Sequence, residues 1–241
     1  MSKILILKLA APMQSWGASS RFTQRGTETF LTKSGIVGLL AAAEGRRRSD
    51  PIEDLAGLRI AARIDQPGEL LRDFHTAHRG GVPMPLSDRF YISDGVFVAF
   101  IEGEDNLIDA LLHAIQRPKF PLFLGRRACP PALPLLLESR SGKMWSAITE
   151  LPWQAARFHQ RKYKTLETVS LRVVADEGII PGRIDSTRTI QDVPLSFASE
   201  RREYGIRNID EARVDLPNPE YVPVVPSQLS AGISHDPMEV I

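Results

Sequence analysis

The order of apolar segments constrains the fold of this chain more than any other feature of its sequence. Apolar runs and alternation predict strands over 4–9, 58–64, 95–101 and 120–124. Apolar side chains at helical spacing predict helices over 32–45 and 105–117. The order is therefore strand, helix, strand, an irregular arm, and again strand, helix, strand. This order is typical of the ferredoxin-like arrangement, in which two helices cover one face of an antiparallel sheet.

The first predicted helix contains two glycines that need an explanation. Thr32 or Ser34 can accept a hydrogen bond from a free amide of the first turn, and Gly45 suits the left-handed residue that ends a helix. Gly35 and Gly38 each destabilise a helix interior by about 1 kcal/mol relative to alanine. We attribute Gly38 to close packing against the sheet. Gly35 has two interpretations, either close packing or an open helix start that a phosphate group can approach.

The arm between the two units cannot be helical, because it contains Gly80, Gly81, Pro83 and Pro85. Its flanks, 73–76 and 89–92, can pair as the base of a β-hairpin.

We divide the chain at residue 135. We expect a first domain over 1–135, with the hairpin near 74–92, and a smaller, β-rich C-terminal extension over 136–241. In the extension, 146–160 has helical character with a break at Pro152, and 166–174 alternates as a strand. Residues 176–192 resemble a loop or an edge hairpin. Five prolines after Asp215 predict an extended or partly disordered tail.

Composition excludes several classes of protein. Apolar residues make up 43% of the chain and charged residues 24%, as in ordinary soluble domains. No apolar run approaches the roughly 20 residues that span a bilayer, and the first residues do not resemble a secretory signal. Cys129 is the only cysteine, so an internal disulfide and a multi-thiolate metal site are excluded. We therefore expect a cytoplasmic protein that does not contact a membrane.

The net charge of +1 hides an uneven distribution of charge. Through Ser49 the chain has eight basic and two acidic residues, a local charge of +6. Two later windows contain four lysines and arginines each and no acidic residue: one lies between Asp109 and Glu138, the other between Glu150 and Glu167. If these windows meet on one face, they form a binding site for a polyanion. The alternative is that they are scattered surface charges.

Catalytic and cofactor motifs are weak or missing. The chain has no Gly-x-x-x-x-Gly-Lys loop, and more than twenty residues separate Leu9 from Gly35, which excludes the dinucleotide fingerprint. His75 and His78 have no third ligand nearby, so we expect no metal and no cofactor. A metal-independent ribonuclease would need a positioned histidine, tyrosine or lysine, and His75, Tyr91 and Lys33 supply these types.

The sharpest local signal is the sequence Leu-Gly-Arg-Arg at 124–127. A glycine directly after a predicted strand lets the backbone approach a ligand, and the paired Arg126 and Arg127 offer forked donors that match a phosphate group. Binding to an acidic partner protein is the alternative. Phe123 and Trp16 can stack on bases, although aromatic residues also form cores.

Four segments in order resemble one known family. They are Leu7-x-Leu9-x-Ala11-Pro12-Met13-Gln14-Ser15-Trp16-Gly17, the stretch 32–40, the pair 73–76 with 91–94, and Phe123-Leu124-Gly125-Arg126-Arg127-Ala128-Cys129-Pro130. Residues 197–204 resemble the same family more weakly. Together they resemble the CasD subunits of the type I-E CRISPR surveillance complex, Cascade, which belong to the repeat-associated mysterious protein (RAMP) superfamily.

The resemblance implies a fold and a function. It implies an RRM-like, ferredoxin-like palm in an α+β protein, with the hairpin as a thumb. It implies a subunit that binds the 5′ handle of CRISPR RNA (crRNA), caps the backbone filament, contacts the backbone and large subunits, and lies near target DNA in the guide–target duplex. In this subtype another subunit cuts the precursor RNA, so the resemblance implies a binder. In a sister subtype the equivalent protein is an endoribonuclease, which makes a metal-independent endoribonuclease the alternative function. A purely structural subunit is a third possibility.

The predicted RNA contacts combine charge, base-edge bonding and stacking. We expect charge from Lys33, Arg46, Arg126 and Arg127, a base-edge bond from Gln14, and stacking by Trp16 or Phe123. Arg89 would meet the RNA backbone where the arm begins. The predicted RNA-binding residues are Gln14, Trp16, Lys33, Ser34, Arg46, Arg89, Phe123, Gly125, Arg126 and Arg127. Loops, more than the sheet face, are expected to supply them.

Overall fold

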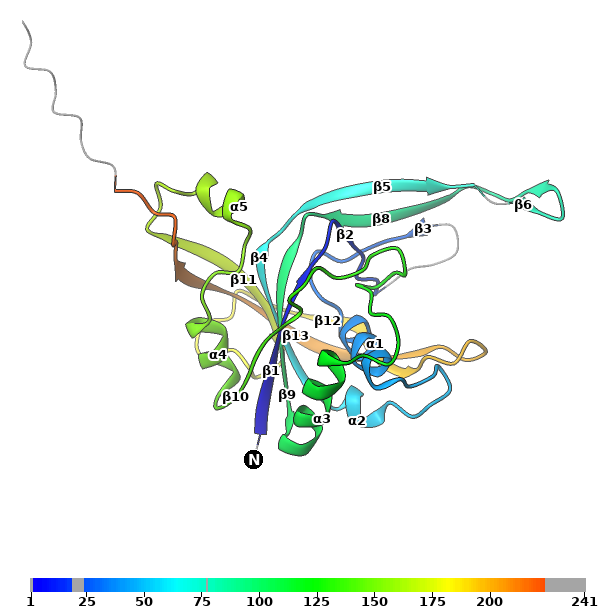
Figure 1. Cartoon of the computed structure of the whole chain (residues 1–241), viewed down its shortest axis with the longest axis horizontal. Coiled ribbons are helices and arrows are strands. Elements are labelled where there is room, and N and C mark those ends of the chain that lie inside the picture. Colours follow the sequence, from blue (N-terminus) through cyan, green and yellow to red (C-terminus); the bar gives the residue numbers. More distant parts are fainter. Residues whose placement is uncertain (1, 19–23, 77, 224–241) are drawn as a thin grey trace, which may run out of the picture.

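The protein is a mixed α/β structure built mostly on antiparallel strands (Figure 1). The computed structural model describes residues 2–18, 24–76 and 78–223. The strands are β1 (Ser2–Ala10), β2 (Met13–Gln14), β3 (Gln24–Arg25), β4 (Arg59–Gln66), β5 (Glu69–His75), β6 (His78–Arg79), β7 (Val82–Pro83), β8 (Ser87–Ser93), β9 (Val96–Glu104), β10 (Leu136–Ser141), β11 (Thr168–Asp176), β12 (Ser186–Ser196) and β13 (Glu203–Pro217). The helices are α1 (Lys33–Glu44), α2 (Glu53–Ala56), α3 (Asp105–Gln116), α4 (Met144–Glu150) and α5 (Arg157–Lys162).

One seven-stranded sheet organises the molecule. Its order is β10-β1-β9-β4-β11-β13-β12, and every neighbouring pair is antiparallel. A smaller sheet contains β2, β8 and β3, with β5 also paired to β8. Strands β6 and β7 form a two-stranded ribbon.

Strand β1 is buried on both faces of the large sheet. Leu5 and Leu7 face α1 and α3, whereas Ile4 and Ile6 face the layer that contains α4, and all four side chains have no exposed surface. Burial on both faces explains why the sequence here is a continuous apolar run instead of an alternating one. Because α4, Leu151 and Trp153 cover the second face, that face of β1 and β9 is closed to ligands.

The two long helices agree with their predictions from periodicity. Helix α1 spans Lys33–Glu44 and ends at Gly45, whose φ of 81° is left-handed. Helix α3 spans Asp105–Gln116 and stops before Pro118. The predicted strands 58–64, 95–101 and 166–174 correspond to β4, β9 and β11.

The predicted strand over 120–124 is wrong. This segment has no strand, and the edge strand that pairs with β1 is β10, further along the chain. The backbone amides of Lys119 and Phe120 instead donate to the carbonyl oxygens of Ala43 and Ala42 at the end of α1. Pro121 has no amide hydrogen, so it weakens any ladder at this position.

The C-terminal part of the described chain continues the same sheet. Strands β11, β13 and β12 extend it beyond β4, and β12 forms an edge, where an edge hairpin was one of two predictions. The predicted break at Pro152 separates α4 from α5. The division of domains at residue 135 stays a prediction, and strands from both sides of it share the large sheet. Most of the proline-rich tail, 224–241, lies outside the described residues.

The arm projects from the rest of the molecule (Figure 1). Its base is the antiparallel pair β5–β8, in which Asp73 lies opposite Arg89, and its tip carries β6 and β7. The two flanks lie on paired strands, but the register differs from the prediction: of 73–76 and 89–92, only Asp73 and Arg89 lie opposite each other, and 90–92 pair with 70–72.

The start of α1 is capped from a distant part of the chain. The predicted caps are wrong: Thr32 makes no side-chain cap bond, and the backbone amide of Lys33 donates to Asp192 Oδ2 at 2.7 Å. Arg207 donates to both Asp192 and Asp176, and Lys33 Nζ lies 3.5 Å from Asp176 Oδ2. These contacts fasten α1 to β11, β12 and β13.

Two absences apply to the described part of the chain. No helix within 2–18, 24–76 and 78–223 is long and apolar enough to cross a membrane. In the same residues, no group of three or more histidine, cysteine or acidic side chains is arranged to hold a metal ion.

The two glycines of α1 give a matched test of packing. A Cβ added at Gly35 would lie 2.7 Å from Trp16 Cε3, but one at Gly38 would meet only Phe197 Cζ at 3.7 Å. Close packing therefore explains the glycine at position 35. Our attribution of close packing to Gly38 is wrong. We expect Gly38→Ala to raise the free energy of unfolding by about 0.5–1 kcal/mol through helix propensity. Gly35→Ala should lower it by about 1–3 kcal/mol because the buried ring cannot move aside.

Thermal unfolding of both variants measures the difference. For a chain of this length each kcal/mol shifts the melting temperature by about 2–4 °C. Equal melting temperatures for the two variants would contradict the packing argument.

Candidate nucleic-acid interface

Four arginines from three separate chain segments gather beside the base of the arm. They are Arg25 of β3, Arg89 of β8, and Arg126 and Arg127 of the loop after Leu124, and we call them the arginine cluster.

The loop that carries Arg126 is fixed by an unusually close approach of two backbones. Gly125 has a φ of 80°, and a Cβ at this residue would lie 1.6 Å from the carbonyl oxygen of Ser15. The amide of Ser15 donates to the carbonyl of Leu124, and the amide of Cys129 donates to the carbonyl of Arg126. Only glycine has both the conformational freedom and the space for this contact.

Arg126 is held in place by an aromatic ring and a backbone carbonyl. Its guanidinium carbon lies 4.5 Å from the centre of the Tyr91 ring, and its Nη2 donates to the carbonyl oxygen of Arg25 at 2.9 Å. Tyr91 is only 3% exposed, so the ring is a rigid platform. The stack and the bond restrict the side chain before any ligand arrives.

Arg25 and Arg89 share one face of the small sheet. They are direct neighbours in the parallel pair β3–β8, and side chains opposite each other in a pair lie on the same face. Tyr91 is two residues beyond Arg89 on β8, so the Arg126 platform is on this face too. The carboxylate opposite Arg89 on β5 belongs to Asp73, which also contacts His75 Nε2 at 2.6 Å.

The cluster has the chemistry of an anion site. Like charges directly opposite each other in a sheet destabilise it, and an anion placed between them removes the repulsion. Guanidinium groups are weakly hydrated and donate in forked pairs that fit phosphate oxygens. Several arginines along one face therefore suit a chain of phosphates better than a single small anion.

Two predicted contact residues lie in the core instead. Gln14 and Trp16 have no exposed surface. Gln14 Nε2 donates to the carbonyls of Leu9 and Gly95, and its Oε1 accepts from Trp16 Nε1 at 3.1 Å. Because these bonds use both groups of the amide, we remove Gln14 and Trp16 from the set of proposed RNA contacts.

Lys33 and Arg46 are also engaged within the chain. Lys33 is 8% exposed, and burial lowers its pKa even though Asp176 acts in the opposite direction. Arg46 donates to Glu44 at 2.7 Å and forms a two-bond pair with Asp54 at 2.6 and 2.5 Å. Both residues stabilise the ends of α1, so we remove them as well.

Ser34 and Phe123 are partly buried. Ser34 lies in the first turn of α1, away from the cluster in sequence, and Phe123 precedes Gly125 in the same loop. Of the ten predicted residues, the structure brings Arg89, Gly125, Arg126 and Arg127 to one place, with Phe123 adjacent in the chain.

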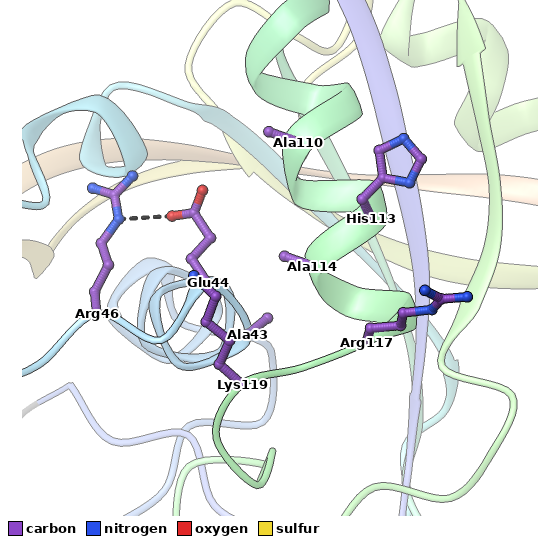
Figure 2. Close-up of a pocket in the computed structure, with 8 residues that line it drawn as sticks. All are labelled: Ala43, Glu44, Arg46, Ala110, His113, Ala114, Arg117 and Lys119. Atoms are coloured by element: carbon purple, nitrogen blue, oxygen red, sulfur yellow. Dashed lines mark hydrogen bonds and ion pairs between the residues drawn. The ribbon is translucent and has the colours of Figure 1, made fainter.

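A second group of cations lies around a cavity between α1 and α3. Figure 2 shows Arg46, Arg117 and Lys119 around a cavity of about 480 Å³ between α1 and α3, together with Glu44 and His113. The two helices end here, and cations near helix C-termini are stabilised by the helix dipole. We assign these cations a structural role.

The residues proposed for a ribonuclease do not form one site. His75 lies opposite Ser87 and Tyr91 lies opposite Leu71, so four strand residues separate them, which is roughly 13 Å. Tyr91 is also covered by Arg126.

Sequence reasoning missed Arg25 and the role of Tyr91. Arg25 was part of the basic excess in the first 49 residues, but nothing in its local sequence places it beside Arg89. The sequence suggests Tyr91 as an acid–base group, and nothing in its local sequence indicates that its ring lies beneath Arg126. The pairing of β3 with β8 joins segments more than sixty residues apart, and no local pattern predicts it.

Comparison with known proteins places the chain in a family. Residues 4–210 match the family described as CRISPR-associated protein (Cas_Cas5). The Escherichia coli K12 protein called CRISPR system Cascade subunit CasD is 33% identical over 159 residues, which cover 57% of this chain and 71% of the relative. A structure titled CRISPR RNA-guided surveillance complex contains a chain 30% identical to this one, with a TM-score of 0.73 over 92% of this chain and 94% of that chain. A second structure, titled Crystal structure of Cas protein, is 30% identical with a TM-score of 0.60, covering 91% and 97%. The resemblance predicted from four motifs is thereby confirmed, and the chain belongs to the CRISPR-associated protein (Cas_Cas5) family.

Proposed function

We propose that this protein is the RNA-binding CasD-type subunit of a type I-E CRISPR surveillance complex, and that it binds the 5′ handle of crRNA through the arginine cluster. The observation that carries the proposal is the gathering of Arg25, Arg89 and Arg126 on one face, with Arg126 held on the Tyr91 ring. The relatives that it resembles are named as subunits of Cascade and of an RNA-guided complex.

The arrangement of the fold supports this role. The strand order β10-β1-β9-β4, with α1 and α3 against one face, supports the proposal of a ferredoxin-like palm. The β5–β8 arm, which begins beside the arginine cluster, is the proposed thumb. A phosphate chain that crosses the cluster would reach the base of this arm, where the guide–target duplex and target DNA would begin.

We propose that the protein binds RNA without cutting it. The separation of His75 from Tyr91, and the burial of Tyr91 under Arg126, leave the candidate acid–base groups without a shared position. The backbone and large subunits are the proposed protein partners. The proposed location is the cytoplasm, where crRNA is made.

Loss of the paired arginines tests handle binding. We expect R126A with R127A to weaken binding of a crRNA handle oligonucleotide at least about tenfold, because charge-assisted hydrogen bonds contribute about 1.5–3 kcal/mol each. The slope of log affinity against log salt should fall by about 0.7 for each lost phosphate contact. Fluorescence anisotropy at four or five salt concentrations measures both quantities.

A matched variant controls for the loss of charge. K143A with R183A removes two exposed cations from other parts of the surface and should leave affinity and slope nearly unchanged. If both double variants behave alike, or if affinity does not change with salt, the arginine cluster is not the handle site.

Gly125→Ala tests the geometry of the site without changing its charge. The new Cβ would collide with the Ser15 carbonyl, and the left-handed backbone adds a further cost of about 1 kcal/mol. We expect the loop to move and Arg126 to leave the Tyr91 ring, so handle affinity should fall while the number of arginines is constant. Gly81→Ala is the control, because Gly81 has a similar φ of 81° and nothing within 4 Å of an added Cβ. Normal binding by Gly125→Ala would show that the loop geometry is irrelevant.

A cleavage assay separates the binder from the endoribonuclease. We expect purified protein to leave repeat RNA intact in chelator, as judged by denaturing gel electrophoresis. A discrete cut that disappears in His75→Ala would reject the non-catalytic role. Assembly of the complex around an RNA without its handle would favour a purely structural subunit instead.

A further inference from the structure

Helix α5 and the residues after it carry an exposed patch of cations and an aromatic ring that handle binding does not use. We call Arg157, Phe158, Arg161, Lys162 and Lys164 the α5 patch. All five are exposed, and the segment between Glu150 and Glu167 has no acidic residue. Figure 1 places α5 and the tip of the arm at opposite ends of the molecule.

The backbone under the patch is rigidly attached to the fold. The amide of Ala156, directly before α5, donates to Gln66 Oε1, and Gln160 Nε2 donates to the carbonyl of Trp153. At the other end, the buried Asn218 Nδ2 donates to the carbonyls of Tyr163 at 2.8 Å and Leu166 at 3.3 Å. A helix of six residues is not stable alone, so these bonds fix the positions of the side chains that α5 exposes.

One carboxylate aligns two arginines of the patch. Arg157 Nε donates to Glu220 Oε1 at 2.5 Å, and Arg161 Nε donates to Glu220 Oε2 at 2.9 Å. The bonds from Arg161 and Arg157 lower the pKa of the Glu220 carboxyl group, which keeps it charged. Among the residues that the structure describes, the terminal Nη groups of both arginines have no partner, and these side chains are 73% and 57% exposed. The carboxylate therefore orders the guanidinium groups and leaves their outer donors available.

The aromatic ring of the patch lies beside a cation. Phe158 is 57% exposed, and Lys162 Nζ lies 5.7 Å from the centre of its ring. A single exposed phenylalanine is ordinary on a protein surface, so the argument depends on the ring and the cation lying together on a fixed helix. A nucleotide has a base and a phosphate as close neighbours, and this pair of side chains matches both.

We propose that the α5 patch is a second nucleic-acid site, which binds single-stranded polynucleotide independently of base sequence. Phe158 stacks on a base, and Lys162, Lys164 and the outer donors of Arg157 and Arg161 bind successive phosphates. Single-strand sites of this kind combine a cationic track with exposed aromatic rings, and the π-face of every base can stack on them.

The arrangement of charge favours a nucleic acid over an acidic protein. Protein interfaces have an apolar centre with charges at the rim. In the α5 patch, Phe158 stands between Arg157 and Arg161 in the chain and Lys162 lies beside its ring, so charge surrounds the ring closely and is not confined to a distant rim. RNA and single-stranded DNA offer the same base and phosphate chemistry, and the experiment must separate them.

The test uses the full-length protein and homopolymers that lack any handle sequence. In a background that already carries R126A and R127A, we expect labelled oligo-U or oligo-dT to retain salt-dependent binding. Phe158→Ala in that background should reduce the remaining affinity about tenfold, within the range for loss of one stacked base. R157A with R161A should also reduce the dependence on salt. The homopolymer that binds more tightly identifies whether RNA or DNA is the ligand.

Controls separate this proposal from handle binding. In the otherwise unaltered chain, Phe158→Ala should leave handle affinity unchanged, whereas R126A with R127A should not. Arg183→Ala removes another exposed arginine and should have little effect on homopolymer binding. Residual binding that Phe158→Ala does not change, or no homopolymer binding once Arg126 and Arg127 are removed, would overturn the α5 site. Circular dichroism and a melting curve verify that each variant is folded.

Discussion

The contact between the Ser15 carbonyl and the backbone of Gly125 is the constraint on which the arginine cluster depends. It brings a loop near the start of the chain against a loop more than a hundred residues later, with no side chain between them. Ser15 Oγ also donates to the carbonyl of Phe90, so the same residue ties both loops to β8. Tyr91 is the next residue of β8, and its ring is therefore in position beneath Arg126. A side chain at residue 125 would separate these three segments.

Local pattern predicted the elements whose cause is local. Periodicity located α1, α3, β4 and β9 because each buries a stripe or a face of its own sequence. The failure at 120–124 has a tertiary cause: the amides of Lys119 and Phe120 complete the end of α1, which leaves β10 to pair with β1. The cap of α1 failed for the same reason, since Asp192 is 159 residues from Lys33. Thr32 stands at the N-cap position, but its side chain makes no cap bond, and the distant Asp192 accepts from the first helical amide.

The residues of the candidate site also differ in whether a local or a long-range cause places them. Gly125, Arg126 and Arg127 were predictable because a glycine next to paired arginines is a local signal with a physical meaning. Gln14, Trp16 and Lys33 were not separable from them by residue type, since polar and aromatic residues in a loop serve a ligand and a core equally well. Their contacts within the fold show that they belong to the core: Gln14 bonds to Gly95, Trp16 to Gln14, and Lys33 lies beside Asp176. The sequence offers residue types that suit the proposed site, and long-range contacts determine which of these side chains stay exposed.

A net charge of +1 implies that long-range attraction contributes little to binding a polyanion. Affinity then has to come from short-range contacts, and these are strongest when the side chains are ordered before binding. The arginine cluster meets this requirement through a ring and a carbonyl, which restrain Arg126. The α5 patch uses a carboxylate, which restrains Arg157 and Arg161 by their Nε atoms. In both cases one nitrogen of each guanidinium group donates within the protein, and this bond fixes the orientation of the rest of the group. Under both proposals, a nearly neutral protein holds an anionic chain through donors that are ordered before the chain arrives.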